Sequence, residues 1–568
     1  MWRFPSRILC WTRARETPRN MLEFRGRILL AIAVGLVAAG VLLSLAGAVL
    51  AGVVLILGLT GELLRIRAAT RPRRPPLGVT ARMTVHDART PSGETRLASH
   101  RAGKWVPLRF RLDVPDGFAS SRLDLLEWWT SPGIDLTESV PRSVLLPSGG
   151  VELDLQALAL NAAVHRILGV HGRLTDPAGL VSVPVFLPSP CEIAVLPRSL
   201  PIDLRRVAET RRMAPRSAGA QRPDKVQGPG DDLRELREHV PGDPFKHIAW
   251  KASARRGRLM SRSFERERTR SLYVVLDTGS TMRDGRPGRG PLDQAMDLVH
   301  SLAEASARGH DPFGLALVDG RVVDQRPVLE GVAAIRDADR ALLDIRRAVA
   351  DDLTPLEEDE LTRVVAGYLT AVERVPLPAD GEDPHVREHF RQRLVMAALA
   401  RLPERERLPM LRGPEPSARP DLAILRRFCR AMDLTLPYRT ALSPPHRVEG
   451  LVEGVAAAMA ARKGPFAIVI ISDFRRLSGG CGPLWLAFAR ARAAGHRVLA
   501  VAVREVEERD VLDLVPDAND ADTARGLLQA DAAARRQLLD ELEDGCRRAG
   551  AAFLPDPDPD ELVALWRQ

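Results

Sequence analysis

A short acidic motif after an apolar run is the first place where this sequence could do chemistry. The run Leu272 to Leu276 predicts a buried strand, and a D-x-G-x-T motif begins directly after it. Its members are Asp277, Gly279 and Thr281. Buried strands of this kind end at the carboxyl edge of a parallel sheet, where α/β proteins bind ligands. One carboxylate with nearby hydroxyl groups suits a hard cation such as Mg²⁺, which prefers oxygen ligands.

The residues before this strand carry a second and longer signal. The block PGDPFKHIAWKASARRGRL combines a Pro-Gly turn, a tryptophan and a basic run. With the acidic motif, it resembles the domain of unknown function 58 family, bacterial von Willebrand factor A-like membrane proteins often encoded beside MoxR-type AAA ATPases. The residues that match the family pattern are Leu236, Arg237, His239, Pro241, Gly242, Asp243 and the run Ile248 to Arg255.

The resemblance implies a metal-ion-dependent adhesion site that holds Mg²⁺. Asp277, Thr281 and Asp473 fall on the family's positions, whereas Gly279 stands where the family has a serine. Water or Ser280 would then have to supply the missing oxygen. The family's second-loop threonine has two candidates, Thr440 and Ser443. The alternative is that the two aspartates only cap strand-to-helix turns.

Alternating strands and helices must position these residues. After Leu272–Leu276 we expect a helix over Leu292–Arg308 and strands over Phe313–Val318, Phe466–Ser472 and Arg497–Val503. This alternation is typical of a doubly wound α/β sheet. The domain is therefore predicted to span 271–568, with a helical insertion at about 333–462.

A long uncharged run near the N-terminus predicts a membrane segment. Residues 28–61 carry no charge, which exceeds the roughly 20 residues that one upright helix needs. The basic segment 1–27 has a net charge of +5 and residues 62–74 have +4. Because basic flanks stay in the cytoplasm, a hairpin turning near Ser44 to Gly47 is favoured over one tilted span. A cleaved signal peptide is disfavoured because the run is too long.

Two further segments separate the membrane region from the α/β domain. Residues 77–200 contain short alternating runs between Pro, Gly, Asp and Ser turns, which predicts a β-sandwich. The turn D-P-x-G-L at Asp176 to Leu180 also resembles the family. Residues 203–270 form a basic connector with 18 Lys or Arg against 10 Asp or Glu. The connector is either a solvated linker or a docking surface, and Trp250 is expected to be buried against the α/β domain.

Composition narrows the function classes. The net charge of +9 resides in the two flanks of the membrane segment, which argues against a nucleic-acid-binding protein. Five scattered cysteines suggest neither disulfides nor a zinc site. The sequence has no P-loop, H-E-x-x-H or G-x-S-x-G motif, so an enzyme is not expected.

These observations predict a multidomain protein of the bacterial inner membrane with its soluble domains in the cytoplasm. The resemblance implies an interaction module that partners a MoxR-type AAA ATPase in complex assembly, maturation or envelope stress. A competing hypothesis is a metal-independent structural adaptor that binds through its basic connector; the missing hydroxyl at Gly279 favours it.

Overall fold

The structure is a computed structural model of the 568-residue chain. It describes residues 22–70, 79–85, 100–136, 140–202, 233–240, 245, 248–264, 271–283, 285–345, 358–378, 381, 383–402, 420–432, 434, 444–462, 464–475, 480–503, 518–556 and 559–567.

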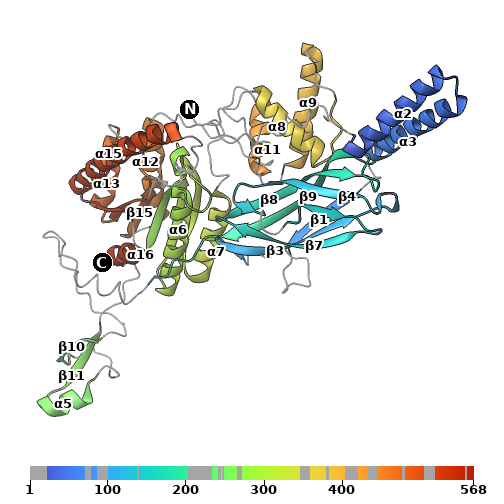
Figure 1. The fold of residues 1–568 in the computed structure, drawn as a ribbon. Helices are drawn as coiled ribbons and strands as arrows, with labels where there is room; N and C mark the ends of the chain where they lie inside the picture. Colours follow the sequence, from blue (N-terminus) through green and yellow to red (C-terminus); the bar gives the residue numbers. More distant parts are fainter. Residues whose placement is uncertain are drawn as a thin grey trace.

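Two apolar helices, α2 (Phe24–Leu42) and α3 (Ala46–Thr70), form an antiparallel hairpin (Figure 1). The chain reverses at Leu43–Leu45, where Ser44 has a φ of 54°. Glycines allow the helices to approach closely, because a Cβ on Gly52 would lie 2.6 Å from the Ala33 carbonyl oxygen. Both helices are long and apolar enough to cross a membrane, and little of either is buried.

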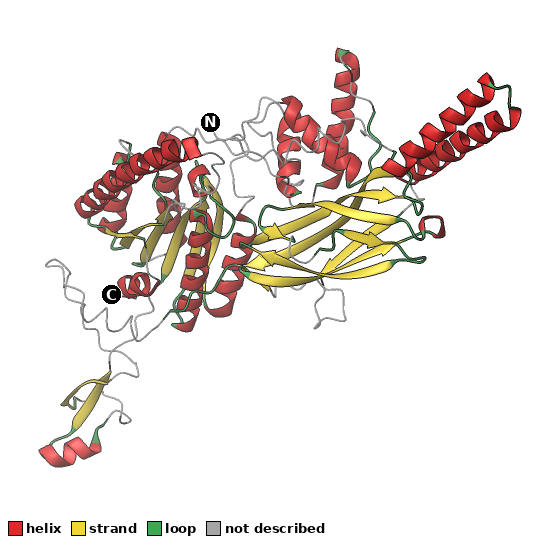
Figure 2. Ribbon diagram, viewed as in Figure 1, coloured by secondary structure: helices red, strands yellow, loops and turns green. Residues whose placement is uncertain are grey.

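In the described part of the chain, nine strands form the next domain, as two sheets around one hydrophobic core (Figure 2). The four-stranded sheet has the order β1-β3-β7-β5, and the five-stranded sheet has the order β2-β9-β8-β4-β6. Strands β2 and β9 pair in parallel, and the other pairs are antiparallel. The strands are β1 (Thr80–Val85), β2 (His100–Arg101), β3 (Lys104–Asp113), β4 (Arg122–Thr130), β5 (Ile134–Asp135), β6 (Ser143–Leu145), β7 (Val151–Ala159), β8 (Ala163–Thr175) and β9 (Ser182–Leu196), with the 3-10 helix η1 (Asp116–Phe118).

The second large domain is built on a six-stranded sheet in the order β14-β13-β12-β15-β16-β17. All its neighbouring strands are parallel except β14, which runs antiparallel to β13. Every residue of β12, β13 and β15 is buried, as expected of strands covered on both faces. The strands are β12 (Leu272–Asp277), β13 (Phe313–Val318), β14 (Val322–Leu329), β15 (Ala467–Ser472), β16 (Arg497–Ala502) and β17 (Ala552–Pro555).

Helices cover both faces of this sheet (Figure 1). One face packs against α6 (Pro291–Arg308), α7 (Gly331–Leu343) and α16 (Pro559–Arg567). The other packs against α12 (Pro444–Ala461), α13 (Gly482–Ala493) and α15 (Ala518–Ala549). The chain is therefore a multidomain protein with an α/β part, in agreement with the coarse prediction from the sequence.

The predicted helical insertion, 333–462, includes two helices that cover the sheet. Helix α12 lies within this range and α7 overlaps its start, and both belong to the layers on the sheet. A separate cluster contains α8 (Glu358–Ala371), α9 (Pro384–Arg401) and α11 (Pro420–Ala431). It shares its core with Leu168, Trp129 and Phe186 of the nine-stranded domain. The inserted helices thus pack on the β domain rather than on the α/β sheet.

The connector contains a small folded unit. Strands β10 (Leu233–Glu238) and β11 (Met260–Phe264) pair in antiparallel fashion, and α5 (Trp250–Arg256) lies between them in sequence. In Figure 1 this unit lies apart from the two large domains. Ile248, Ala249 and Met260 form its small interior. Trp250 is 64% exposed, so the prediction that its indole is buried against the α/β domain was wrong: the buried apolar side chains of this unit include Ile248 and Met260 instead.

A polar junction joins the β domain to α6. The Arg198 amide donates to Asp297 Oδ1 at 2.8 Å, and the Asn161 side-chain amide donates to Asp293 Oδ1 at 2.9 Å. Burial raises the pKa of Asp297 to about 6, although the Arg198 amide and charge act in the opposite direction. The junction therefore contains a carboxyl group whose pKa is raised to about 6, well above the usual value for aspartate.

Candidate functional site

The carboxyl edge of the six-stranded sheet brings the predicted acidic residues together. From β12 the chain goes to β13 on one side and later returns to β15 on the other side. The point between β12 and β15 is therefore the topological switch point, where open α/β sheets bind ligands. Asp277 is the last residue of β12 and Asp473 follows β15 directly. Both are buried, with exposures of 0% and 2%.

Local backbone and hydroxyl groups hold Asp277 in place. The Gly279 amide donates to its Oδ1 at 2.8 Å, and the Ser472 hydroxyl donates to its Oδ2 at 2.6 Å. The Ser472 hydroxyl itself accepts from the Phe474 amide at 2.9 Å. These contacts fix the carboxylate against the end of β15.

The side chain of Arg447 lies between the two aspartates. Its Nη2 is 2.6 Å from Asp277 Oδ2 and 2.5 Å from Asp473 Oδ1. Its Nε donates to Asp277 Oδ2 at 2.9 Å. Its Nη1 donates to the Thr281 hydroxyl and, at 2.8 Å, to the Arg475 carbonyl oxygen. The three nitrogens of the guanidinium thus all face acceptors, in a cluster that is closed to solvent.

Helix α12 delivers this arginine because one face of the helix lies directly on the sheet. Arg447, Gly450 and Gly454 are spaced at i, i+3 and i+7, which places them on that face. A Cβ on Gly450 would lie 1.9 Å from the Asp319 carbonyl oxygen, and one on Gly454 would lie 2.6 Å from Val275 Cγ1. The two glycines therefore let the helix approach β12 and β13 closely enough for Arg447 to reach Asp277.

The charges at the switch point stabilise one another. Burial by itself raises the pKa of Asp473, but the Arg447 guanidinium and neighbouring hydrogen bonds outweigh it, and the pKa is lowered from its usual value. Burial likewise lowers the pKa of Arg447, yet the charges of Asp277 and Asp473 leave it raised. The arginine is therefore a permanent cation between carboxylates, and its planar fork suits this bridging role.

The structure brings together three of the predicted site residues. Asp277, Thr281 and Asp473 all contact the Arg447 side chain. Ser280 begins the 3-10 helix η3 (Ser280–Arg283), but its side chain is outside the described part of the structure. Thr440 and Ser443 also lie outside the described residues.

The residues at the switch point do not fit the divalent cation that the family resemblance implies. Mg²⁺ needs about six oxygen ligands at roughly 2.0–2.1 Å. The guanidinium occupies Asp277 Oδ2, Asp473 Oδ1 and the Thr281 hydroxyl, and the Gly279 amide occupies Asp277 Oδ1, so of the two carboxylates only Asp473 Oδ2 is without a hydrogen bond. Among the residues that the structure describes, no group of three or more His, Cys, Asp or Glu could hold a metal ion. A serine at position 279 would not by itself restore a metal site while Arg447 is in place. Its Cβ would lie 2.9 Å from Asp277 Oδ1 and 3.1 Å from Arg447 Nε.

Sequence reasoning did not identify Arg447. Two signals could have found it. An arginine stands on the face of α12 that also carries Leu451 and Val455, and an arginine on an apolar helix face needs a buried acidic partner. The second signal is Gly279 itself: the family has a serine at this position, and the glycine lacks the side chain that would contact the guanidinium.

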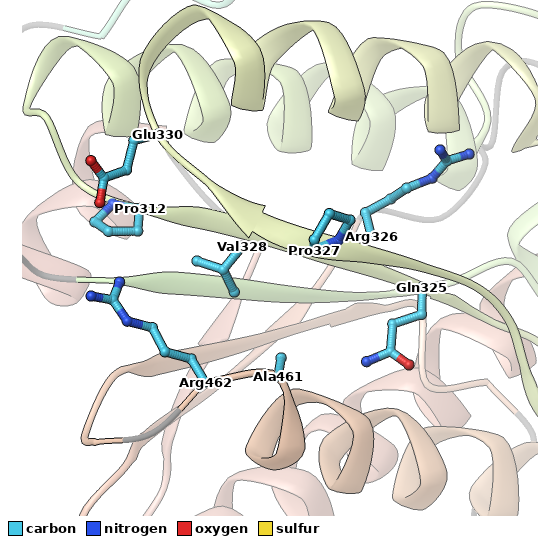
Figure 3. Close-up of a pocket in the computed structure, with 8 residues that line it drawn as sticks. All are labelled: Pro312, Gln325, Arg326, Pro327, Val328, Glu330, Ala461 and Arg462. Atoms are coloured by element: carbon cyan, nitrogen blue, oxygen red, sulfur yellow. The ribbon is translucent and has the colours of Figure 1, made fainter.

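A surface pocket lies elsewhere on the same domain (Figure 3). It is formed beside the edge strand β14 and the C-terminal end of α12, with Arg462 and Glu330 among its lining residues. Pro312, which precedes β13, also lines it. The pocket is thus at the amino end of β13, away from the edge that carries Asp277, and is not part of this site.

Comparison with known proteins supports the family resemblance over part of the chain. Residues 235–372 match the family described as protein of unknown function DUF58. The uncharacterized protein YeaD of Bacillus subtilis (strain 168) is 26% identical over 144 residues. That alignment covers 24% of this chain and 34% of the relative, so the chain spans about a third of the relative's length. The matched segment contains Asp277 and most of the residues that carry the resemblance, and over this segment the chain is similar to the domain of unknown function 58 family.

Proposed function

We propose that this chain is a membrane-anchored protein-interaction module rather than an enzyme. The observation that carries the proposal is the apolar hairpin. Large side chains point outward around both helices, with Ile32, Leu42, Leu50 and Leu57 all more than half exposed. A helix that is apolar on all sides and is not buried in protein belongs in lipid.

The hairpin is held firmly by the β domain. At the start of α2, the Glu23 amide donates to the Leu180 carbonyl oxygen at 3.1 Å. Leu180 belongs to the D-P-x-G-L turn, in which Asp176 accepts hydrogen bonds from the Leu180 and Val181 amides. At the end of α3, Arg65 donates to the Gly117 carbonyl oxygen and lies over the Phe118 ring. Both ends of the hairpin therefore meet the same domain, which favours both lying on one side of the membrane.

The basic flanks favour the cytoplasm for that side. We therefore propose the bacterial inner membrane, with the β domain as a β-sandwich and the six-stranded domain as a von Willebrand factor A-like domain. The parallel sheet and its two helical layers support the second assignment. The family resemblance supports a MoxR-type AAA ATPase as the partner, in complex assembly, maturation or envelope stress.

The β10–β11–α5 unit is the surface that we propose for docking. Its residues 233–264 contain eight Lys or Arg against three Asp or Glu. Phe245 and Trp250 are 79% and 64% exposed, beside the exposed basic residues Lys251, Arg255 and Arg256. Exposed aromatic groups next to cationic ones are typical of interface hot spots, and their charge suits an acidic protein surface. This favours the metal-independent adaptor that binds through its basic connector.

The test is binding of the detergent-solubilised full chain to the purified MoxR-type ATPase of the same organism. The variant Trp250→Ala with Arg255→Glu and Arg256→Glu should weaken binding by at least about tenfold. A matched control carries Arg490→Glu on α13, which is also exposed. Equal binding by all three proteins would refute the docking surface. If the parent does not bind the ATPase but its basic unit binds vesicles of anionic lipid, the proposed partner is wrong.

A further inference from the structure

At the switch point, the Arg447 side chain occupies the place between Asp277 and Asp473 where the family resemblance implies a metal ion. We propose that Arg447 is a tethered cation that permanently takes the place of a divalent ion. The side chain connects Asp277, Thr281 and Asp473, the three residues that the family resemblance assigns to a metal. The protein would then hold its two switch-point carboxylates together without any metal. This inference does not depend on the identity of the partner.

The hydrogen-bond inventory supports a closed arrangement. A guanidinium has five N–H donors. The donors at Nε and Nη1 reach Asp277, the Thr281 hydroxyl and the Arg475 carbonyl oxygen. Those at Nη2 reach Asp277 and Asp473. Every donor has an acceptor within the protein, so the guanidinium has no N–H left for the carboxylate of a partner, although Asp473 Oδ2 is buried without a hydrogen bond.

The surrounding residues are shaped for an arginine. Gly279 leaves the space that the guanidinium needs, since a Cβ would lie 3.1 Å from Arg447 Nε. Gly450 and Gly454 bring α12 against the sheet. Arg447 is only 4% exposed, so its displacement by a metal would require a buried cation to leave its two partners. The glycine at position 279 is therefore compatible with the guanidinium of Arg447, whereas a larger residue there would crowd it.

The first test measures cation binding by the detergent-solubilised full chain. Calorimetric titration with Mn²⁺ and with Mg²⁺ should give no saturable heat, and neither the cations nor a chelator should shift the melting temperature. A saturable Mn²⁺ signal, together with a higher melting temperature, would overturn the inference. Cation binding by the unmutated protein is therefore sufficient to support or overturn the inference.

The second test removes the tethered cation. The double variant Arg447→Ala with Gly279→Ser frees the acidic oxygens and adds a hydroxyl group. Its melting temperature should fall by roughly 10 °C without metal and rise again with Mn²⁺. The single variant Gly279→Ser keeps Arg447 and serves as the control, which should not respond to Mn²⁺. A Mn²⁺ response of the same size in this control would contradict the proposed role of Arg447.

Discussion

Replacing Arg447 with methionine is the sharpest perturbation of the switch point. Methionine fills much of the same volume but leaves Asp277 and Asp473 buried without their cation. Removing one partner of a buried ion pair typically costs about 3–5 kcal/mol. The cost should stay within that range although two carboxylates are affected, because the Gly279 amide and the Ser472 hydroxyl still donate to Asp277. For a domain of this size the melting temperature should drop by roughly 10 °C.

The pH dependence of that loss separates charge from packing. In the parent, the pKa of Asp473 is lowered, so its stabilising contribution is present at neutral pH and is lost only as the pH falls through its folded-state pKa. In the variant, burial acts on Asp473 without the guanidinium and raises its pKa, so stability is lost as the pH rises. The difference between the two proteins should therefore widen from about pH 4 to pH 7.

Thermal unfolding followed by circular dichroism measures this difference at each pH. Arg490→Met, on the exposed side of α13, is the matched control and should change the melting temperature by about 1 °C or less. A loss below about 1 kcal/mol for Arg447→Met at pH 7, or a loss that does not change with pH, would refute the reasoning.

Three other variants test separate parts of the structure. Gly279→Ser should destabilise the protein by about 1–3 kcal/mol through the short contact with Asp277, whereas Gly482→Ser, where a Cβ meets nothing within 4 Å, should not. Trp250→Ala should cost less than about 1 kcal/mol in unfolding experiments because the indole is exposed, while Ile248→Ala in the same unit should cost about 2 kcal/mol or more. Asp297 has a raised pKa of about 6, so stability is lost as the pH rises through that value. Asp297→Asn should flatten the dependence of the melting temperature on pH between about 4 and 6, and an unchanged profile would rule out this carboxyl group as the cause.

Much of the fold could be predicted from local patterns in the sequence. The uninterrupted apolar runs at Leu272–Leu276 and Phe313–Val318 predict buried parallel strands, and both are found. The uncharged run with two basic flanks predicts a hairpin, and the chain reverses at Ser44 within the predicted turn. These two predictions agree with the structure because strands buried on both faces and helices suited to lipid both require uninterrupted runs of apolar residues.

The site itself depends on contacts between distant segments, and there the sequence alone fails. Arg447 lies 170 residues from Asp277 along the chain, so no local spacing connects them. At Gly279 the sequence shows only that one oxygen ligand is missing. It does not show that the cation at the site is an arginine rather than a metal ion. The position of Trp250 shortly before the first strand of the α/β domain predicts that its indole packs against that domain, but the indole is 64% exposed.

Anomalous diffraction from crystals grown with Mn²⁺ tests the central claim most directly. We expect guanidinium density between Asp277 and Asp473 and no anomalous peak within coordinating distance of either carboxylate. A manganese peak bound to Asp277, with the Arg447 side chain displaced from the switch point, would contradict the claim that this protein carries its own cation.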